Sequence, residues 1–125
     1  MRGAGLLAAL LAFWLAAAAP ALASPFQDWT AVVVAGDWHA HSGGPSEAFD
    51  NARRDVAHAL ERAGFPAENL RQYSVRPERY RDTRPERTDL STIYDDLATL
   101  TARSPGGCLF YLTSHGSPAG AVVDD

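Results

Sequence analysis

An apolar run at residues 108–113 constrains the fold of this chain more than any other stretch. The run is Cys-Leu-Phe-Tyr-Leu-Thr, without alternation of polar and apolar side chains. Such runs are typical of strands buried on both faces in a parallel sheet beneath helices. Gly106 and Gly107 precede the run, and Gly116-Ser117-Pro118 follow it as a turn signal. We therefore expect an α/β domain organised around this strand.

A histidine, His115, stands just past the carboxyl end of this expected strand, and Gly116 follows it. In open α/β sheets, ligands and chemistry collect at that edge. Two interpretations of His115 are open: a functional imidazole, or a side chain that only hydrogen-bonds a turn. Cys108, at the other end of the run, is predicted to be a small buried core residue.

The segment 29–75 carries the patterns of a strand, a helix and a second strand. Residues 29–35 are apolar around Val-Val-Val and end in Gly36-Asp37. A helix is predicted over 46–63, with Ser46 as N-cap and Gly64 at its end. Its apolar stripe consists of Phe49, Ala52, Val56, Ala59, Leu60 and Ala63, which leaves Asp50 on another face. A shorter, more polar strand over 70–75 is expected near a sheet edge, completing a right-handed βαβ unit.

The segment from 76 onward begins with mixed charges and ends in the apolar run. Five arginines, two prolines and three acids in 76–88 favour a solvated loop, with a basic patch as the alternative. Asp89 is placed to cap a helix over 90–103, and 121–123 starts another extended segment. The predicted domain thus has three strands and two helices in an α/β layered arrangement.

The first 23 residues have the pattern of a targeting segment. Arg2 precedes an apolar stretch at 6–18, and residues 21–23 fit a small-x-small cleavage site. The stretch is shorter than the roughly 20 residues that a membrane span needs. We expect export to the periplasm or the exterior, with a mature domain over 24–125 that is not membrane-bound. That domain holds 10 arginines against 15 acids, which argues against nucleic acid as a partner.

Several of these stretches together resemble the legumain-like (asparaginyl endopeptidase) family of cysteine peptidases, in its bacterial exported branch. The matching stretches cover nearly all of 29–120. They are Ala35-Gly36-Asp37, Phe49-Asp50-Asn51-Ala52-Arg53, Gly64-Phe65 and the run from Cys108 to Pro118. The resemblance implies a caspase-like α/β/α fold with a mostly parallel sheet, of which only the first three strands and two helices are present. It also implies a peptide or protein substrate and no cofactor.

The resemblance assigns chemistry to His115 and Gly116. His115 would be the general base, and the Gly116 backbone N–H would donate to the oxyanion. The family's nucleophile is a cysteine at the end of the next parallel strand, whereas the single cysteine here is Cys108. At about 3.3 Å per residue, the strand separates Cys108 from His115 by roughly 20 Å. A nucleophile and its base need about 3 Å. We therefore expect a domain truncated before the nucleophile strand and inactive as given.

The loop after the first strand departs from the family pattern. The family holds a basic residue there to grip an acidic or amide side chain, but residues 37–42 contain no arginine. A preference for Asn or Asp in the substrate is therefore not carried over. Asp37 is expected to help shape the substrate pocket.

Three other functions are open from the residues themselves. His39, His41 and His115, with Asp37, have the residue types of a zinc site with an open position. Ser114 and Ser117 flank His115 but lie in no G-x-S-x-G elbow, which disfavours a serine hydrolase. The third alternative is a non-catalytic, exported binding module or inactive fragment of the same fold.

Overall fold

The computed structural model describes residues 22–124. Residues 1–21, which hold most of the expected targeting segment, lie outside this part. Within it, no helix is long and apolar enough to cross a membrane. In chain order the elements are β1 (Trp29–Ala35), α2 (Ala48–Ala63), the 3-10 turn η1 (Ala67–Asn69), β2 (Leu70–Ser74), the 3-10 turn η2 (Pro77–Arg79), β3 (Glu86–Arg87), α3 (Leu90–Arg103), β4 (Gly107–Thr113), β5 (Gly116–Ser117) and β6 (Gly120–Ala121).

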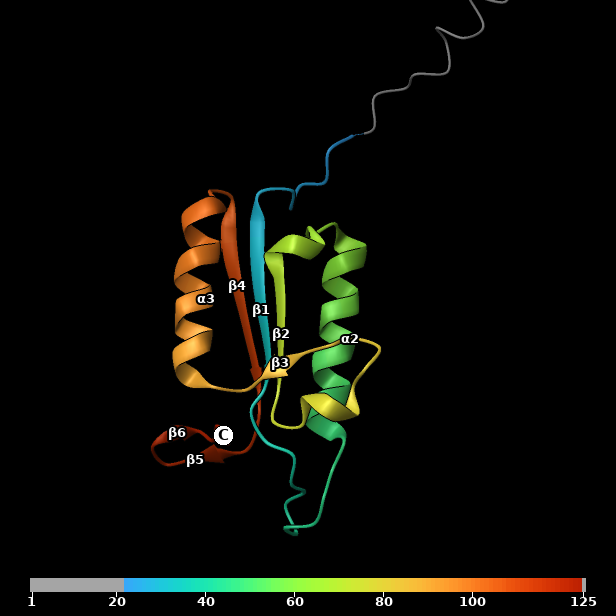
Figure 1. Cartoon of the computed structure of the whole chain (residues 1–125), viewed down its shortest axis with the longest axis vertical. Coiled ribbons are helices and arrows are strands. Elements are labelled where there is room, and N and C mark those ends of the chain that lie inside the picture. Colours follow the sequence, from blue (N-terminus) through green and yellow to red (C-terminus); the bar gives the residue numbers. More distant parts are fainter. Residues whose placement is uncertain (1–21, 125) are drawn as a thin grey trace, which may run out of the picture.

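The main sheet has the strand order β3-β2-β1-β4, and every pair in it is parallel (Figure 1). The longest pairing joins β1 to β4, from Trp29 beside Gly107 to Ala35 beside Thr113. The predicted α/β class is confirmed. The predicted count of three strands is wrong, because the short β3 adds a fourth strand and β5 and β6 form a separate hairpin.

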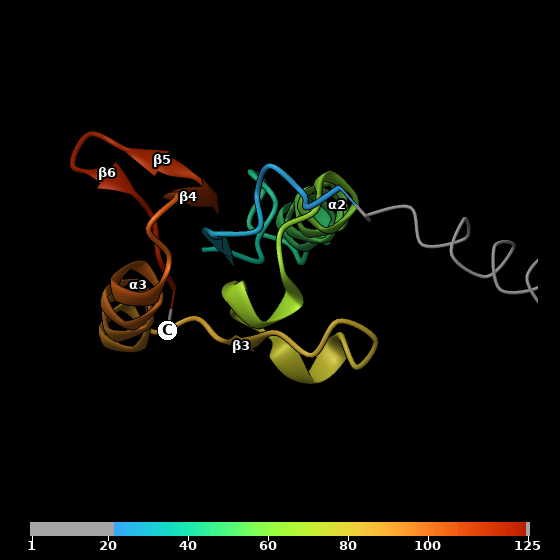
Figure 2. The same cartoon turned by 90° about the horizontal axis from the view of Figure 1, so that it is seen from above.

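The two helices cover opposite faces of the sheet, which gives three layers (Figure 2). On one face, Val32 and Val34 of β1 pack with Ile93 and Leu100 of α3. On the other face, Ala31 of β1 packs with a cluster that includes Ala57, Phe65 and Leu70. The uninterrupted apolar sequence of β1 follows from this position, since both of its faces are covered.

The predicted central strand is instead the outer strand of the described sheet. β4 pairs with β1 along one edge only, and Phe110 is 49 % exposed. Cys108 is exposed, so its prediction as a buried core residue is wrong. The run 108–113 is apolar enough for an interior strand, but no described element covers its second edge. β1 takes the interior place.

The second predicted strand is also not at an edge. β2 lies between β1 and β3, and Tyr73 and Ser74 are fully buried. The segment 76–88 is not simply a solvated loop. It forms η2 and β3, and it buries Tyr80 and Thr88 against the domain. The Thr88 hydroxyl donates to the Ala35 carbonyl (3.0 Å), which ties this segment to the end of β1.

Helix α2 buries charge on a face that the sequence placed outside its apolar stripe. Asp50 and Arg53 are 1 % and 0 % exposed, and Nε of Arg53 donates to Asp50 at 2.8 Å. The segment 76–88 covers this face. The other groups around the pair are Gln72 and Thr83, which accept from Arg53, Ser74, which donates to Asp50, and the ring of Tyr80.

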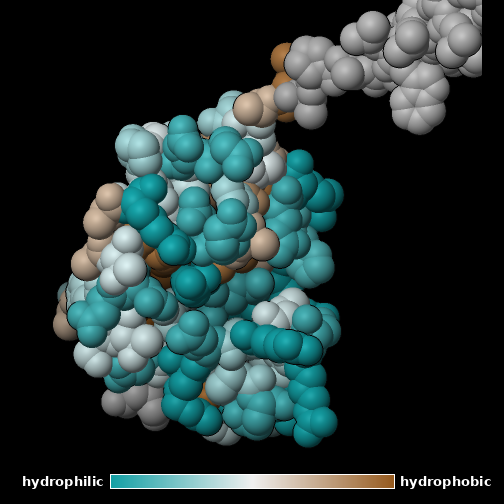
Figure 3. All heavy atoms as spheres, turned by 45° about the horizontal axis from the view of Figure 1, so that its top comes forward, coloured by the Kyte–Doolittle hydropathy of each residue, from teal (hydrophilic) through white to brown (hydrophobic). Residues whose placement is uncertain are grey.

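The end of α2 and the start of α3 follow their predicted signals, whereas the start of α2 does not. Helix α2 starts at Ala48, two residues later than expected, and its N-cap is Glu47, so the prediction of Ser46 as N-cap is wrong. Ser46 Oγ instead accepts from the Ala48 N–H at 3.1 Å, in the turn that precedes the helix. Gly64 ends α2 in the left-handed conformation, at φ 100°. Asp89 caps α3 by accepting from the Thr92 N–H. The molecular face shown in Figure 3 is mainly hydrophilic, with apolar side chains visible between polar ones.

Candidate functional site

The chain order of the strands reverses at the β1–β4 pair. From β1 the chain moves outward to β2 and β3, then returns through α3 to β4 on the other side of β1. In such open parallel sheets, the crevice beyond the carboxyl ends at this reversal is the usual binding site. Gly36-Asp37 leave β1 there, and Ser114-His115 leave β4. The Gly36 N–H donates to the Thr113 carbonyl at 2.9 Å, so the two exits are joined.

We call the edge of the sheet where β1 and β4 end the rim. His115 is held at this rim by a backbone carbonyl and an aromatic ring. Its Nε2 lies 2.9 Å from the carbonyl oxygen of His39. The Phe49 ring meets the imidazole edge to face, with centroids 5.0 Å apart. His115 is partly buried, so the imidazole is fixed in place and still reachable from solvent.

The contact with His39 sets the proton position on His115. A carbonyl oxygen only accepts, so the contact is a hydrogen bond only when Nε2 carries the proton. In the neutral imidazole the other nitrogen, Nδ1, is then the basic atom. Nδ1 has no hydrogen bond to any residue that the structure describes. The geometry thus leaves one defined acceptor nitrogen.

The hairpin after His115 leaves the Gly116 N–H free of ladder bonds. Val122 donates to the His115 carbonyl at 2.8 Å, and Gly116 pairs with Ala121 in the antiparallel β5–β6 ladder. Antiparallel pairs alternate between hydrogen-bonded and non-hydrogen-bonded positions, and the bond at 115/122 makes 116/121 a non-hydrogen-bonded pair. A Cβ added at Gly116 would meet nothing within 4 Å. This N–H is therefore open to a ligand.

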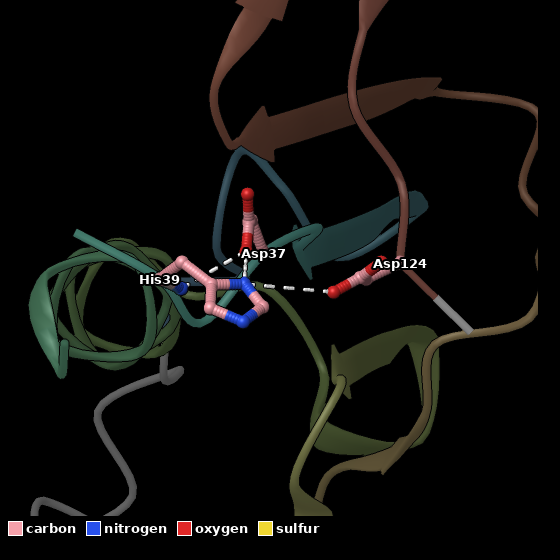
Figure 4. A group of neighbouring side chains, drawn as sticks. All are labelled: Asp37, His39 and Asp124. Carbon is pink, nitrogen blue, oxygen red and sulfur yellow. Dashed lines mark hydrogen bonds and ion pairs between the residues drawn. The ribbon is translucent and has the colours of Figure 1, made fainter. Parts of the chain in front are cut away.

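Asp37 lies next to this site but is buried, at 5 % exposed. Its Oδ1 accepts from the N–H groups of Trp38 (2.6 Å) and His39 (2.9 Å), and from Nδ1 of His39 at 2.8 Å (Figure 4). Burial alone would raise the pKa of Asp37, but these hydrogen bonds from Trp38 and His39 outweigh it and lower the pKa below its usual value. The predicted pocket residue is thus a fixed, ionised anchor of the turn.

The side chains that come together as a possible metal site differ from those that the sequence suggested. Asp37 and His39 come together with Asp124, and their ligand atoms lie within 4.8 Å of one another (Figure 4). His41 and His115 are not in this group, and their ring centroids are 6.2 Å apart. Nδ1 of His39 already donates to Asp37, so a cation there would have to replace that hydrogen bond.

A basic side chain reaches the rim from a place that the sequence did not suggest. Arg76 follows β2, and its guanidinium lies 4.7 Å from the centre of the Trp38 ring. Nη2 donates to the Ser46 carbonyl at 2.9 Å and to Glu47 at 3.2 Å. Nε is buried and has no partner among the described residues. Arg76 was missed because strand ends meet only once the sheet order is known.

The other candidate nucleophiles are the Cys108 thiol and the hydroxyls of Ser114 and Ser117. None of them makes a hydrogen bond to the His115 ring in the described structure. Cys108 pairs with Thr30 at the start of β1, whereas His115 follows the end of β4. Although Cys108 is exposed, desolvation of its thiol raises the pKa, which lowers the thiolate fraction. The hydroxyls of Ser114 and Ser117 both donate to backbone carbonyls of the following segment, at 2.5 and 2.9 Å.

An apolar groove runs beside the rim, between α3 and the open side of β4. It has a volume of about 560 Å³ and is lined by Val34, Leu90, Ile93, Tyr94, Leu97, Phe110, Leu112, Ala121 and Val123. Its walls come from α3, from β1 and β4, and from the segment that begins at β6. Comparison with models of protein families, with curated proteins and with solved structures finds no significant match.

Proposed function

We propose that this domain carries the general-base part of a legumain-like, cysteine-type endopeptidase site with a caspase-like fold. The observation that carries the proposal is His115 at the strand-order reversal, with Nε2 bound to a carbonyl and Nδ1 free. A base whose orientation is fixed by another group is what thiol activation requires. The expected targeting segment adds that the protein acts outside the cytoplasm, on peptides or proteins.

The proposed reaction uses two groups at the rim, Nδ1 of His115 and the backbone N–H of Gly116. Nδ1 of His115 takes the proton of a nucleophilic thiol, and the sulfur attacks the peptide carbonyl carbon. The Gly116 N–H donates to the developing oxyanion. The C–N bond then breaks, and the leaving amine takes the proton from Nδ1. Water, deprotonated by the same nitrogen, hydrolyses the thioester and regenerates the thiol.

The thiol in this proposal is not Cys108, which sits at the opposite end of the sheet. A strand that paired with the free edge of β4 in the same direction would end at the same rim as His115. Its last residue is the place where a nucleophilic cysteine fits. Arg76, at the exit of β2, is the basic side chain best placed to bind an acidic or amide group of a substrate.

The proposal is tested first with fluorogenic peptides that contain Asn or Asp. The 125-residue chain should give no turnover, because it supplies no cysteine at the rim. Turnover that is lost in both His115→Ala and Cys108→Ser would contradict the placement of the nucleophile. Turnover that survives His115→Ala would contradict the role of the base.

The coding sequence beyond codon 125 provides a second test of the proposed function. An open frame that continues into an apolar strand ending in cysteine supports the proposal. The longer protein should then hydrolyse the peptides and lose activity in His115→Ala but not in the neighbouring control His41→Ala. A stop codon at that point would instead favour the non-catalytic binding module.

A further inference from the structure

Three residues form a continuous chain of contacts from the end of β1 to the imidazole of His115. Asp37 accepts from the backbone N–H groups of residues 38 and 39, which closes a tight turn. It also accepts from the ring of His39, so both the backbone and the side chain of that residue are fixed. The carbonyl of His39 then contacts Nε2 of His115 at 2.9 Å.

We propose that Asp37 is a positioning residue for His115, acting through the His39 carbonyl to keep the proton on Nε2 and leave Nδ1 as the acceptor. This inference rests on the proposed function, since a fixed acceptor nitrogen matters only if His115 is a base. Asp37 itself makes no contact with His115; its effect passes through one backbone carbonyl.

The burial of Asp37 supports this role over that of a surface ion pair. Its side chain is 7 % exposed, whereas the other carboxylate near His39, that of Asp124, is 44 % exposed and lies 3.7 Å from Nδ1. A buried carboxylate that accepts three hydrogen bonds holds its partners far more firmly than an exposed one. Asp124 also touches neither backbone N–H of the turn in the described structure, which makes it a matched control.

The test is the tautomer of His115, observed by long-range ¹H–¹⁵N correlation in the ¹⁵N-labelled full chain. In the wild type, the ratio of Nε2–H to Nδ1–H should exceed that of a free histidine imidazole by about fivefold, the bias expected from one net hydrogen bond. Asp37→Ala should remove that added bias and return the ratio to that of the free imidazole. Asp37→Asn should keep most of the bias, because the amide oxygen still accepts from both N–H groups of the turn. Asp124→Asn should leave it unchanged.

Two results would overturn the inference: a wild-type His115 protonated mainly on Nδ1, or a folded Asp37→Ala variant with an unchanged tautomer ratio. If Asp37→Ala does not fold, the wild type is tested instead. The measurement is the NMR scalar coupling across the hydrogen bond, between Nε2 of His115 and the carbonyl carbon of His39. Its absence would refute the contact. None of these measurements needs turnover, so they fail or succeed independently of the peptidase assay.

Discussion

Replacing Arg53 by Met tests whether the buried ion pair between Asp50 and Arg53 in α2 stabilises the domain. The guanidinium is fully buried, and its removal leaves the Asp50 carboxylate, also buried, with the Ser74 hydroxyl as its one hydrogen-bond donor among the described side chains. Breaking a buried ion pair on one side typically costs about 3–5 kcal/mol. The whole domain is expected to have about 5–15 kcal/mol of stability, so this cost is a large fraction of it. Urea unfolding followed by circular dichroism should show a midpoint lower by about 2–3 M, for a slope of about 1.5 kcal/mol/M.

The matched control for this variant is the next residue along the helix. Arg54 also pairs with a carboxylate, that of Asp82 at 2.5 Å, but both side chains are substantially exposed. Arg54→Met should therefore change the stability by less than about 1 kcal/mol. The double variant Asp50→Leu/Arg53→Met should recover part of the loss, since no unpaired charge remains. A cost below about 1 kcal/mol for Arg53→Met would refute the reasoning.

Four further predictions concern the ends of the sheet and of α2. Gly64→Ala should cost about 1–2 kcal/mol in urea unfolding, because φ is 100° there, and an unchanged midpoint would contradict the strain. Gly36→Ala should displace the C-terminal segment, since a Cβ would lie 2.8 Å from the Val122 carbonyl oxygen; unchanged Val122 amide shifts would show otherwise. Cys108 should react with iodoacetamide in the native state, though more slowly than free cysteine because its pKa is raised. Asp37→Asn should lower the stability at pH 7 by about 2 kcal/mol. Because the folded pKa of Asp37 is depressed, the wild-type advantage exists above the unfolded value of about 3.9 and should shrink as pH falls below it; a constant difference in acid would contradict this.

Local sequence patterns predicted most of the helices and strands, and they predicted that Asp37 and His115 lie at strand ends. Periodicity and end signals placed both helices, with the Asp89 cap and the Gly64 terminus where the structure has them. The runs at 29–35 and 108–113 became strands, and their parallel pairing brings Asp37 and His115 to one rim. These predictions succeeded because each depends on interactions within a few residues, or on the rule that parallel strands end at the same edge.

The remaining features depend on contacts between distant segments. An Asp50–Arg53 pair at i,i+3 has the same sequence pattern on an exposed helix face as on a buried one, and only the cover from 76–88 makes it internal. The apolar run in β4 predicts an interior strand, but the order of strands decides which run is interior. The acceptor that fixes His115 is a backbone carbonyl, and every residue has one.

The order in which the chain is made does not match the order of the sheet. β1, which is synthesised first, needs β4 along its whole length, from Trp29 beside Gly107 onward. No stable domain can therefore assemble until nearly all of the described residues are available. Folding should be slow for the domain's size, because its main pairing closes a long loop.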